Sequence, residues 1–146
     1  MLHPPMDSLD QVRTYLDRRT AVTVLSTCDP RGIPEASLLV APRVTSEGKI
    51  AGGEEEFVGG RTFRNLRQNA RATLLVLDPI MDPRARDGLR IEVEFLGAES
   101  DGEELQHITE WLGTFAPGRR MVRRLIFKIL DAARYRPEAT SPIIGE

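Results

Sequence analysis

One stretch of the chain combines residue types that bind phosphate. Gly59 and Gly60 precede Arg61 and Thr62, which open a predicted short helix that ends near Asn69. Glycine lets the backbone turn and approach a ligand closely. The first N–H groups of a helix have no partner within the helix and attract anions. The pattern predicts a phosphate cradle, and hence a phosphorylated cofactor, against the alternative of an ordinary solvated helix start.

The residues just before this stretch allow two interpretations each. Gly52 and Gly53 fit either a close approach of a ligand or a bulge in a strand. The acidic run at 54–56, which begins with Glu54, is interpreted as a solvated loop, with a metal or proton-transfer role as the alternative.

The arginines at 119, 120, 123 and 124 are interpreted as solvent-exposed, wet surface. The exception would be Arg123 or Arg124, either of which could reach a ligand of a partner subunit.

Other kinds of chemistry have no pattern to support them. Cys28 is the only cysteine, so an intrachain disulfide is impossible, and His3 and His107 lie far apart without a second ligand at a useful spacing. We therefore predict no metal site. The sequence also lacks a Ser-His-Asp or Cys-His grouping, a dinucleotide glycine signature, and the interleaved basic and aromatic residues typical of RNA binding.

Length and composition indicate one globular domain over residues 1–146. The chain is 40% hydrophobic and 29% charged, which is too apolar for disorder, and its net charge of −2 gives no reason to expect a nucleic-acid partner. No apolar stretch approaches the roughly 18 residues of a membrane span, and the start lacks the pattern of an export signal. We expect a cytoplasmic protein without a membrane partner.

Periodicity and turn signals give the order of the elements that must position the cradle. Hydrophobic spacing predicts helices from Ser8 and over 103–115, and runs of β-branched and apolar residues predict strands. Asp29-Pro30-Arg31-Gly32 is a strong turn sequence. Short links between the strands favour an antiparallel sheet, closed as a small barrel with peripheral helices. Six strands are predicted, over 21–27, 35–45, 49–53, 72–77, 89–98 and 122–135.

In order and spacing, these segments resemble the pyridoxamine 5'-phosphate oxidase-like flavin-binding split barrels, and among them the small FMN-binding proteins. The similarity covers roughly residues 21–110. It includes the Asp-Pro-Arg-Gly-Ile-Pro turn, the Gly-Arg-Thr-x-x-Asn-Leu-x-x-Asn helix from Gly60, the apolar strand after Arg71, and the strand that begins Leu89-Arg90-Ile91. The resemblance implies a mainly β, six-stranded split-barrel homodimer that holds FMN in a groove at the subunit interface.

The resemblance also implies roles for individual residues. Arg61 stands where the family usually has lysine, and a guanidinium can bind two phosphate oxygens at once. Thr62 would add its hydroxyl and its backbone N–H. The flavin ring would lie along main-chain groups of two strands, at Leu38, Leu39 and Val40 on one strand and Gly52, Gly53 and Glu54 on the next. Beside these, Arg124 is the candidate that could reach the flavin of the partner subunit.

Three functions remain open at this point. The first is an FMN-dependent oxidoreductase, in which the flavin passes hydride or electrons to a small molecule that the sequence does not identify. The second is a flavin carrier or sensor without turnover. The third is a related split barrel that uses a deazaflavin such as F420 or haem, or that has lost its ligand and acts as an interaction module.

Overall fold

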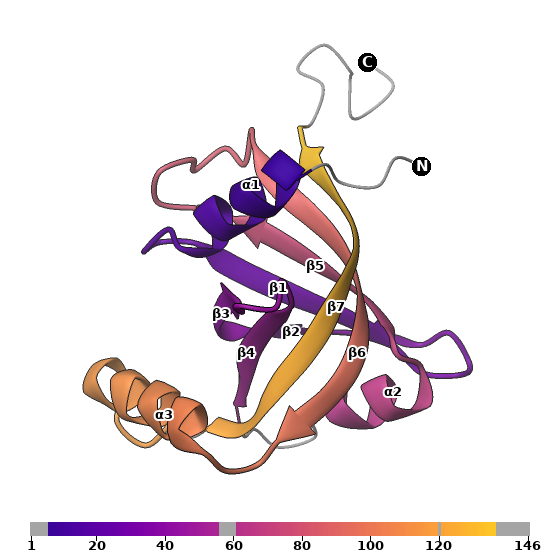
Figure 1. The fold of residues 1–146 in the computed structure, drawn as a ribbon, viewed down its shortest axis with the longest axis vertical. Helices are drawn as coiled ribbons and strands as arrows, with labels where there is room; N and C mark the ends of the chain where they lie inside the picture. Colours follow the sequence, from indigo (N-terminus) through magenta and orange to yellow (C-terminus); the bar gives the residue numbers. More distant parts are fainter. Residues whose placement is uncertain (1–5, 56–60, 120, 137–146) are drawn as a thin grey trace.

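The computed structural model describes residues 6–55, 61–119 and 121–136, and within them it shows a curled antiparallel sheet with three helices (Figure 1). The sheet curls because strands twist, and a strongly twisted sheet buries one face against itself. The helices are α1 (Met6–Leu16), α2 (Thr62–Gln68) and α3 (Glu103–Phe115). The strands are β1 (Val22–Cys28), β2 (Pro34–Leu38), β3 (Val40–Val44), β4 (Ile50–Glu55), β5 (Arg71–Leu77), β6 (Gly88–Glu99) and β7 (Met121–Tyr135).

The order of the strands places two consecutive strands at the two edges of the sheet. All neighbours are antiparallel, in the order β2-β1-β5-β6-β7-β4-β3. Because β2 and β3 follow each other in the chain, the two edges meet where they join, and the sheet is a barrel with a split at this place. The predicted mainly β split barrel is confirmed.

The number of strands differs from the prediction because the expected strand over 35–45 is two strands. The strand is interrupted at Leu39, which is 3% exposed and lies in the core. Its N–H donates to the Thr23 carbonyl at 2.9 Å. Ala41 then takes a positive φ of 49°, and the pairing of β3 with β4 is irregular between Val40 and Arg43. The bend lets one segment pair with β1 and the next with β4. Apart from Pro42, the residues over 35–45 favour a strand, and this pattern does not show that Leu39 turns into the core.

The core fills the inside of the curled sheet. Its largest fully buried side chains come from five strands and two helices: Val12, Leu25, Ile50, Leu66, Leu74, Val76, Leu89, Ile91, Val93, Leu125 and Phe127. A second, smaller cluster lies under α3, where Leu105 and Leu112 pack with Met121 of β7. In Figure 1, β3 and β4 lie between α1 and α3.

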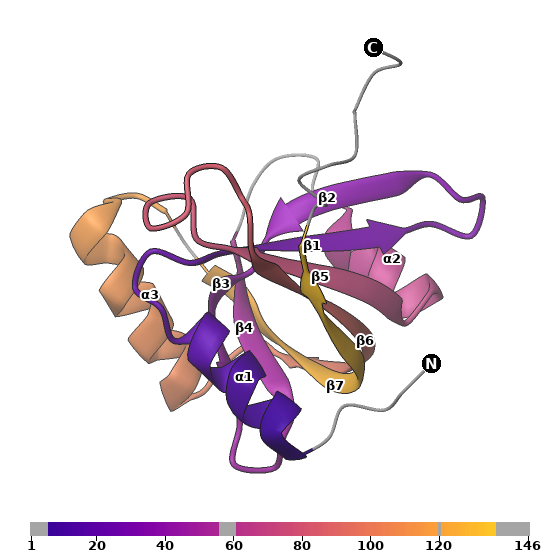
Figure 2. The same cartoon turned by 90° about the horizontal axis from the view of Figure 1, so that it is seen from above.

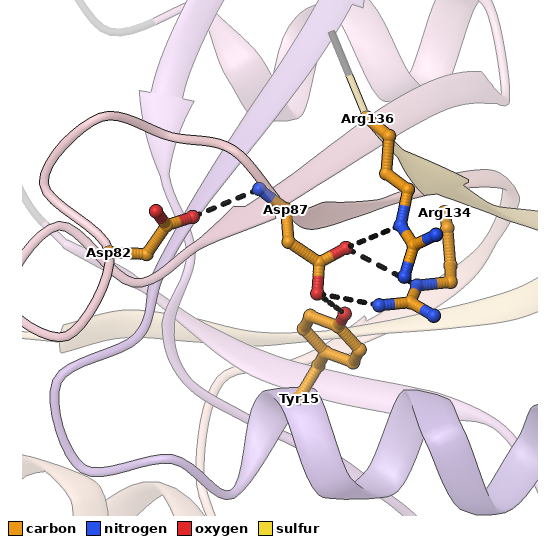
Figure 3. A network of polar contacts seen from close by, with 5 residues as sticks. All are labelled: Tyr15, Asp82, Asp87, Arg134 and Arg136. Carbon is orange, nitrogen blue, oxygen red and sulfur yellow. Dashed lines mark hydrogen bonds and ion pairs between the residues drawn. The ribbon is translucent and has the colours of Figure 1, made fainter. Parts of the chain in front are cut away.

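A polar network fastens α1 to the end of the sheet (Figure 3). The Tyr15 hydroxyl donates to Asp87 at 2.5 Å, and the Arg134 guanidinium donates to both oxygens of the same carboxylate at 3.2 and 2.9 Å. The bonds from Arg134 and Tyr15 lower the pKa of Asp87 to about 2, against an ordinary value of 3.8. Burial, and then Asp87, raise the pKa of Tyr15. The network therefore holds its charges across neutral pH and positions the β5–β6 loop.

The same loop is tied at both ends. At its start, the Asp78 carboxylate accepts from the Thr20 hydroxyl and, at 3.1 Å, from the N–H of Met81. At its end, the N–H of Asp87 donates to Asp82 at 2.9 Å (Figure 3). Between these ties, Met81 is 77% exposed. Among the described residues, no helix is both long enough and apolar enough to cross a membrane.

Candidate functional site

The helix that begins with the predicted phosphate cradle is anchored to the barrel by its inner face. Asn65 is buried and its amide donates to the Thr27 hydroxyl of β1 at 3.1 Å, and Leu66 is fully enclosed in the core. A buried amide with a partner and a buried leucine both favour one placement of the helix. The start of α2 is therefore fixed against the hairpin of β1 and β2 (Figure 2).

At the start of α2, two predicted residues contact β2 in different ways. Arg61 is exposed, and its backbone N–H donates to Oε2 of Glu35 at 2.8 Å. Thr62 is only 2% exposed, and its hydroxyl lies 3.0 Å from the hydroxyl of Ser37. Glu35 and Ser37 are two residues apart on a strand and so share one face. Arg61 is thus available to a ligand, whereas the Thr62 hydroxyl is engaged with β2.

A hollow of about 440 Å³, called here the arginine hollow, opens between α2 and the β1–β2 turn. The guanidinium groups of Arg31, Arg61 and Arg64 line it together with the carboxylates of Asp29 and Glu35. The N–H groups of Ile33 and Arg31 both donate to Asp29 at 2.9 Å, and with the Arg31 guanidinium they lower its pKa. The hollow therefore holds one more positive charge than negative at neutral pH.

A larger hollow of about 910 Å³, called here the α3 groove, lies between α3, the end of α1 and strands β1 to β3. Its apolar residues include Val22, Leu38, Leu39, Val40, Ile108 and Leu112. Its basic residues are Arg18, Arg19, Arg43, His107, Arg119 and Arg124. Leu38 is 52% exposed, so the groove presents unburied apolar surface to whatever enters it. Such a lining suits a molecule with an apolar body and few polar groups.

Gly52 and Gly53 line neither hollow, because both are buried in β4. A Cβ on Gly52 would lie 2.6 Å from Cγ of Leu39, and one on Gly53 would lie 2.5 Å from Sδ of Met121. Contacts this short do not occur between packed side chains, so both glycines make room for core residues. The irregular pairing of β4 with β7 falls after them, between Glu54 and Glu55.

The acidic residues that follow these glycines are neutralised by arginines of β7 and its preceding turn. Glu54 accepts from Arg123 at 2.9 Å, and Glu55 forms an ion pair with Arg119. The Arg123 guanidinium also lies 3.9 Å from the centroid of the Phe63 ring, a cation–π contact that ties β7 to α2. Arg119 stays exposed, as predicted for a wet surface, but both arginines also form ion pairs.

The structure therefore brings together some of the predicted positions and separates others. Leu38, Leu39, Val40 and Arg124 share the α3 groove, and the Arg124 guanidinium also contacts Glu99 at 3.3 Å. Arg61 lies in the arginine hollow. Gly52, Gly53 and Glu54 lie on β4 and line neither hollow, although their neighbours Ala51 and Glu55 line the α3 groove. The prediction for Gly60 concerns a position outside the described residues.

Several residues of the arginine hollow were not predicted from the sequence. Glu35 and Ser37 alternate on β2, so their shared face was a usable signal once the strand was assigned. Arg64 follows Arg61 by three residues, which places the two on neighbouring turns of a helix. Arg31 lies in the turn sequence Asp29–Gly32, from which only a backbone turn was predicted. What the sequence lacked was the position of α2 relative to this hairpin.

Comparisons with known proteins place the fold. None of the known protein-family models matches the sequence, and no curated protein matches it. Solved structures do match. An FMN-binding protein from Syntrophomonas wolfei subsp. wolfei aligns with a TM-score of 0.71 and 21% identity, over 90% of this chain and 88% of its own. A Clostridium acetobutylicum protein of the pyridoxinephosphate oxidase family aligns at 0.62 and 15%, over 91% of each chain.

A third match has a different name. A protein called F420 reductase aligns with a TM-score of 0.58 and 14% identity, over 83% of this chain and 94% of its own. At these identities the comparisons establish the fold. The chain has the pyridoxamine 5'-phosphate oxidase-like, FMN-binding split-barrel fold, which confirms the resemblance seen in the sequence.

Proposed function

We propose that this protein binds FMN along the open edge of β2 and acts as a homodimeric flavin-dependent oxidoreductase. The observation that carries the proposal is that β2 leads from one hollow to the other. Glu35 lines the arginine hollow, and Leu38 lines the α3 groove. The three residue steps between them span about 10 Å of extended strand. A ribityl chain of five carbons, which separates the phosphate of FMN from its ring, is of this order of length.

The residues of the arginine hollow fit the phosphate end. Three guanidiniums line it, and Arg61 offers both a guanidinium and, in place of its bond to Glu35, a backbone N–H. Charge-assisted hydrogen bonds of guanidinium to phosphate are among the stronger polar contacts in proteins. The buried Thr62 hydroxyl would act through Ser37, by holding the start of α2 against β2.

The residues at the other end fit the flavin ring. β2 is an edge strand whose described pairing is with β1 alone, so the main-chain groups on its outer side are available to a ligand. The ring of a flavin carries imide and nitrogen groups that backbone N–H and C=O can match, and its faces need apolar cover. The side chains of Leu38 and Val40 supply such cover at the mouth of the α3 groove.

When bound, FMN supplies hydride or electron transfer, and the protein has to hold and shield it. The Arg61 and Arg64 guanidiniums would bind and orient the phosphate, and the edge of β2 would fix the plane of the ring. Leu38 and Val40 would exclude water from one face. The absence of a catalytic acid or base motif in the sequence is compatible with this division of work.

The exposed apolar residues support a homodimer. Leu38, Val22 and Trp111 are 52%, 36% and 51% exposed and all line the α3 groove. A clustered apolar surface of this kind on a small protein marks an interaction site. A second copy packed over the open edge of β2 would cover part of it and complete the enclosure of the flavin.

Purification of the protein, followed by denaturation and mass analysis of any released chromophore, tests the proposal. The expected result is a yellow protein that releases FMN, or a colourless one that binds added FMN and becomes reducible by NADH or NADPH. A protein that takes up F420 but not FMN would favour the deazaflavin alternative, which the similarity to an F420 reductase supports. A protein that binds no flavin at all would refute the proposal.

A further inference from the structure

The α3 groove carries an excess of positive charge over an apolar lining. Its charged residues are five arginines against three carboxylates, those of Asp17, Glu55 and Glu104. Two of the arginines form ion pairs with carboxylates, Arg119 with Glu55 and Arg124 with Glu99.

The remaining arginines of the groove are Arg18, Arg19 and Arg43. The Arg18 guanidinium lies 4.2 Å from the centroid of the Tyr15 ring. Among the residues that the structure describes, no carboxylate lies within ion-pair distance of Arg19 or Arg43. Two exposed guanidiniums thus border a groove of about 910 Å³.

We propose that the α3 groove binds a small organic anion, with an apolar body and one carboxylate. An apolar body gains free energy by covering Leu38 and Val40, because apolar surface is removed from water. A carboxylate can form two parallel hydrogen bonds to one guanidinium, such as that of Arg43. A neutral molecule of the same shape would lack these bonds, and a cation would be repelled.

The position of the groove gives this anion a role. Leu38 and Val40 belong to the same surface that is proposed to cover the flavin ring, so an anion in the groove would lie beside the ring. This inference rests on the proposed function: the substrate that reacts with the flavin is a small apolar carboxylate. The binding itself depends only on the groove and can be measured without flavin.

The test uses the full-length protein and calorimetric titration with 2-naphthoate, with 2-naphthalenemethanol as the neutral probe of similar shape. Naphthoate should bind more tightly, and Arg43→Gln should weaken naphthoate binding about fivefold, the scale of an exposed ion pair, while leaving the neutral probe unchanged. Arg90→Gln is the matched control, because Arg90 is exposed on β6 and does not line the groove. Leu38→Ser should weaken both probes.

Equal affinity for the two probes, or an Arg43→Gln variant with unchanged naphthoate binding, would overturn the inference. A Leu38→Ser variant that dissociates the dimer without affecting either probe would assign the groove to a second copy and would also overturn it. A parallel titration with FMN separates the two proposals. If FMN binds and naphthoate does not, only this inference falls. If naphthoate binds and FMN does not, the flavin function falls together with the substrate role, and only the anion site of the groove stands.

Discussion

Glu35 places a negative charge where the phosphate of FMN is expected, so removal of this charge should strengthen FMN binding. Its carboxylate accepts the N–H of Arg61 at 2.8 Å and lines the same hollow as Arg31, Arg61 and Arg64. A phosphate that binds Arg61 must displace this carboxylate or lie beside it. Glu35→Gln removes the charge but keeps an oxygen that can accept the Arg61 N–H. The variant should therefore fold normally and bind FMN more tightly.

The size of the effect follows from the charges. Two unit charges 4 Å apart repel by about 1 kcal/mol in water and about 4 kcal/mol at an effective dielectric constant of 20. Glu35 is only half-buried, so the lower part of this range applies. We expect FMN to bind Glu35→Gln about tenfold more tightly, which corresponds to about 1.4 kcal/mol.

Quenching of flavin fluorescence on titration with the flavin-free protein measures both affinities. Riboflavin, which has the same ring but no phosphate, should bind the variant and the original protein equally. Glu47→Gln is the control variant, because Glu47 lies on a turn outside the arginine hollow. An unchanged FMN affinity, or an equal gain for riboflavin, would show that Glu35 does not face the phosphate and would refute the reasoning.

The remaining predictions concern one binding residue and two features of the fold. Arg61→Ala should weaken FMN binding by about 1.5–3 kcal/mol in the same titration, and no change would exclude Arg61 from the site. Gly52→Ala should lower the free energy of unfolding in urea by about 1–3 kcal/mol, because its Cβ would lie 2.6 Å from a core leucine, whereas Gly97→Ala, which meets nothing within 4 Å, should cost little packing energy. Asp87 has a folded pKa of about 2 against an ordinary 3.8, so it stabilises the fold above pH 4 and this contribution is lost as the pH falls toward 2. Asp87→Asn should cost about 1–2 kcal/mol at pH 7 and less at pH 3, and an equal loss at both would refute the assignment.

Most of the fold could be predicted because each strand carries its own signal. The turn at Asp29–Gly32 separates two predicted strands, a third is predicted from Leu89, and the structure has β1, β2 and β6 at these places. The bend at Leu39 was missed, because it arises from the burial of one side chain in a core that the whole sheet forms. Local patterns contain no information of that kind.

The candidate site was less predictable than the fold for a related reason. Arg61 could be singled out because glycines and a helix start adjoin it in the sequence. Its partner Glu35 lies 26 residues earlier and meets it only after β2 and α2 pack together. Gly52 resembled a ligand-facing glycine, yet its missing side chain makes room for Leu39. A sequence shows that a glycine is present, and the surrounding packing decides what it accommodates.

The central claim is that FMN lies along the edge of β2, and a crystal structure of the protein with bound FMN tests it most directly. The account predicts the phosphate within hydrogen-bonding distance of Arg61, in the arginine hollow, and the ring along the main chain of Leu38 to Val40. The claim would be contradicted by a flavin bound elsewhere, with the Glu35 carboxylate still accepting the Arg61 N–H and no ligand along the edge of β2.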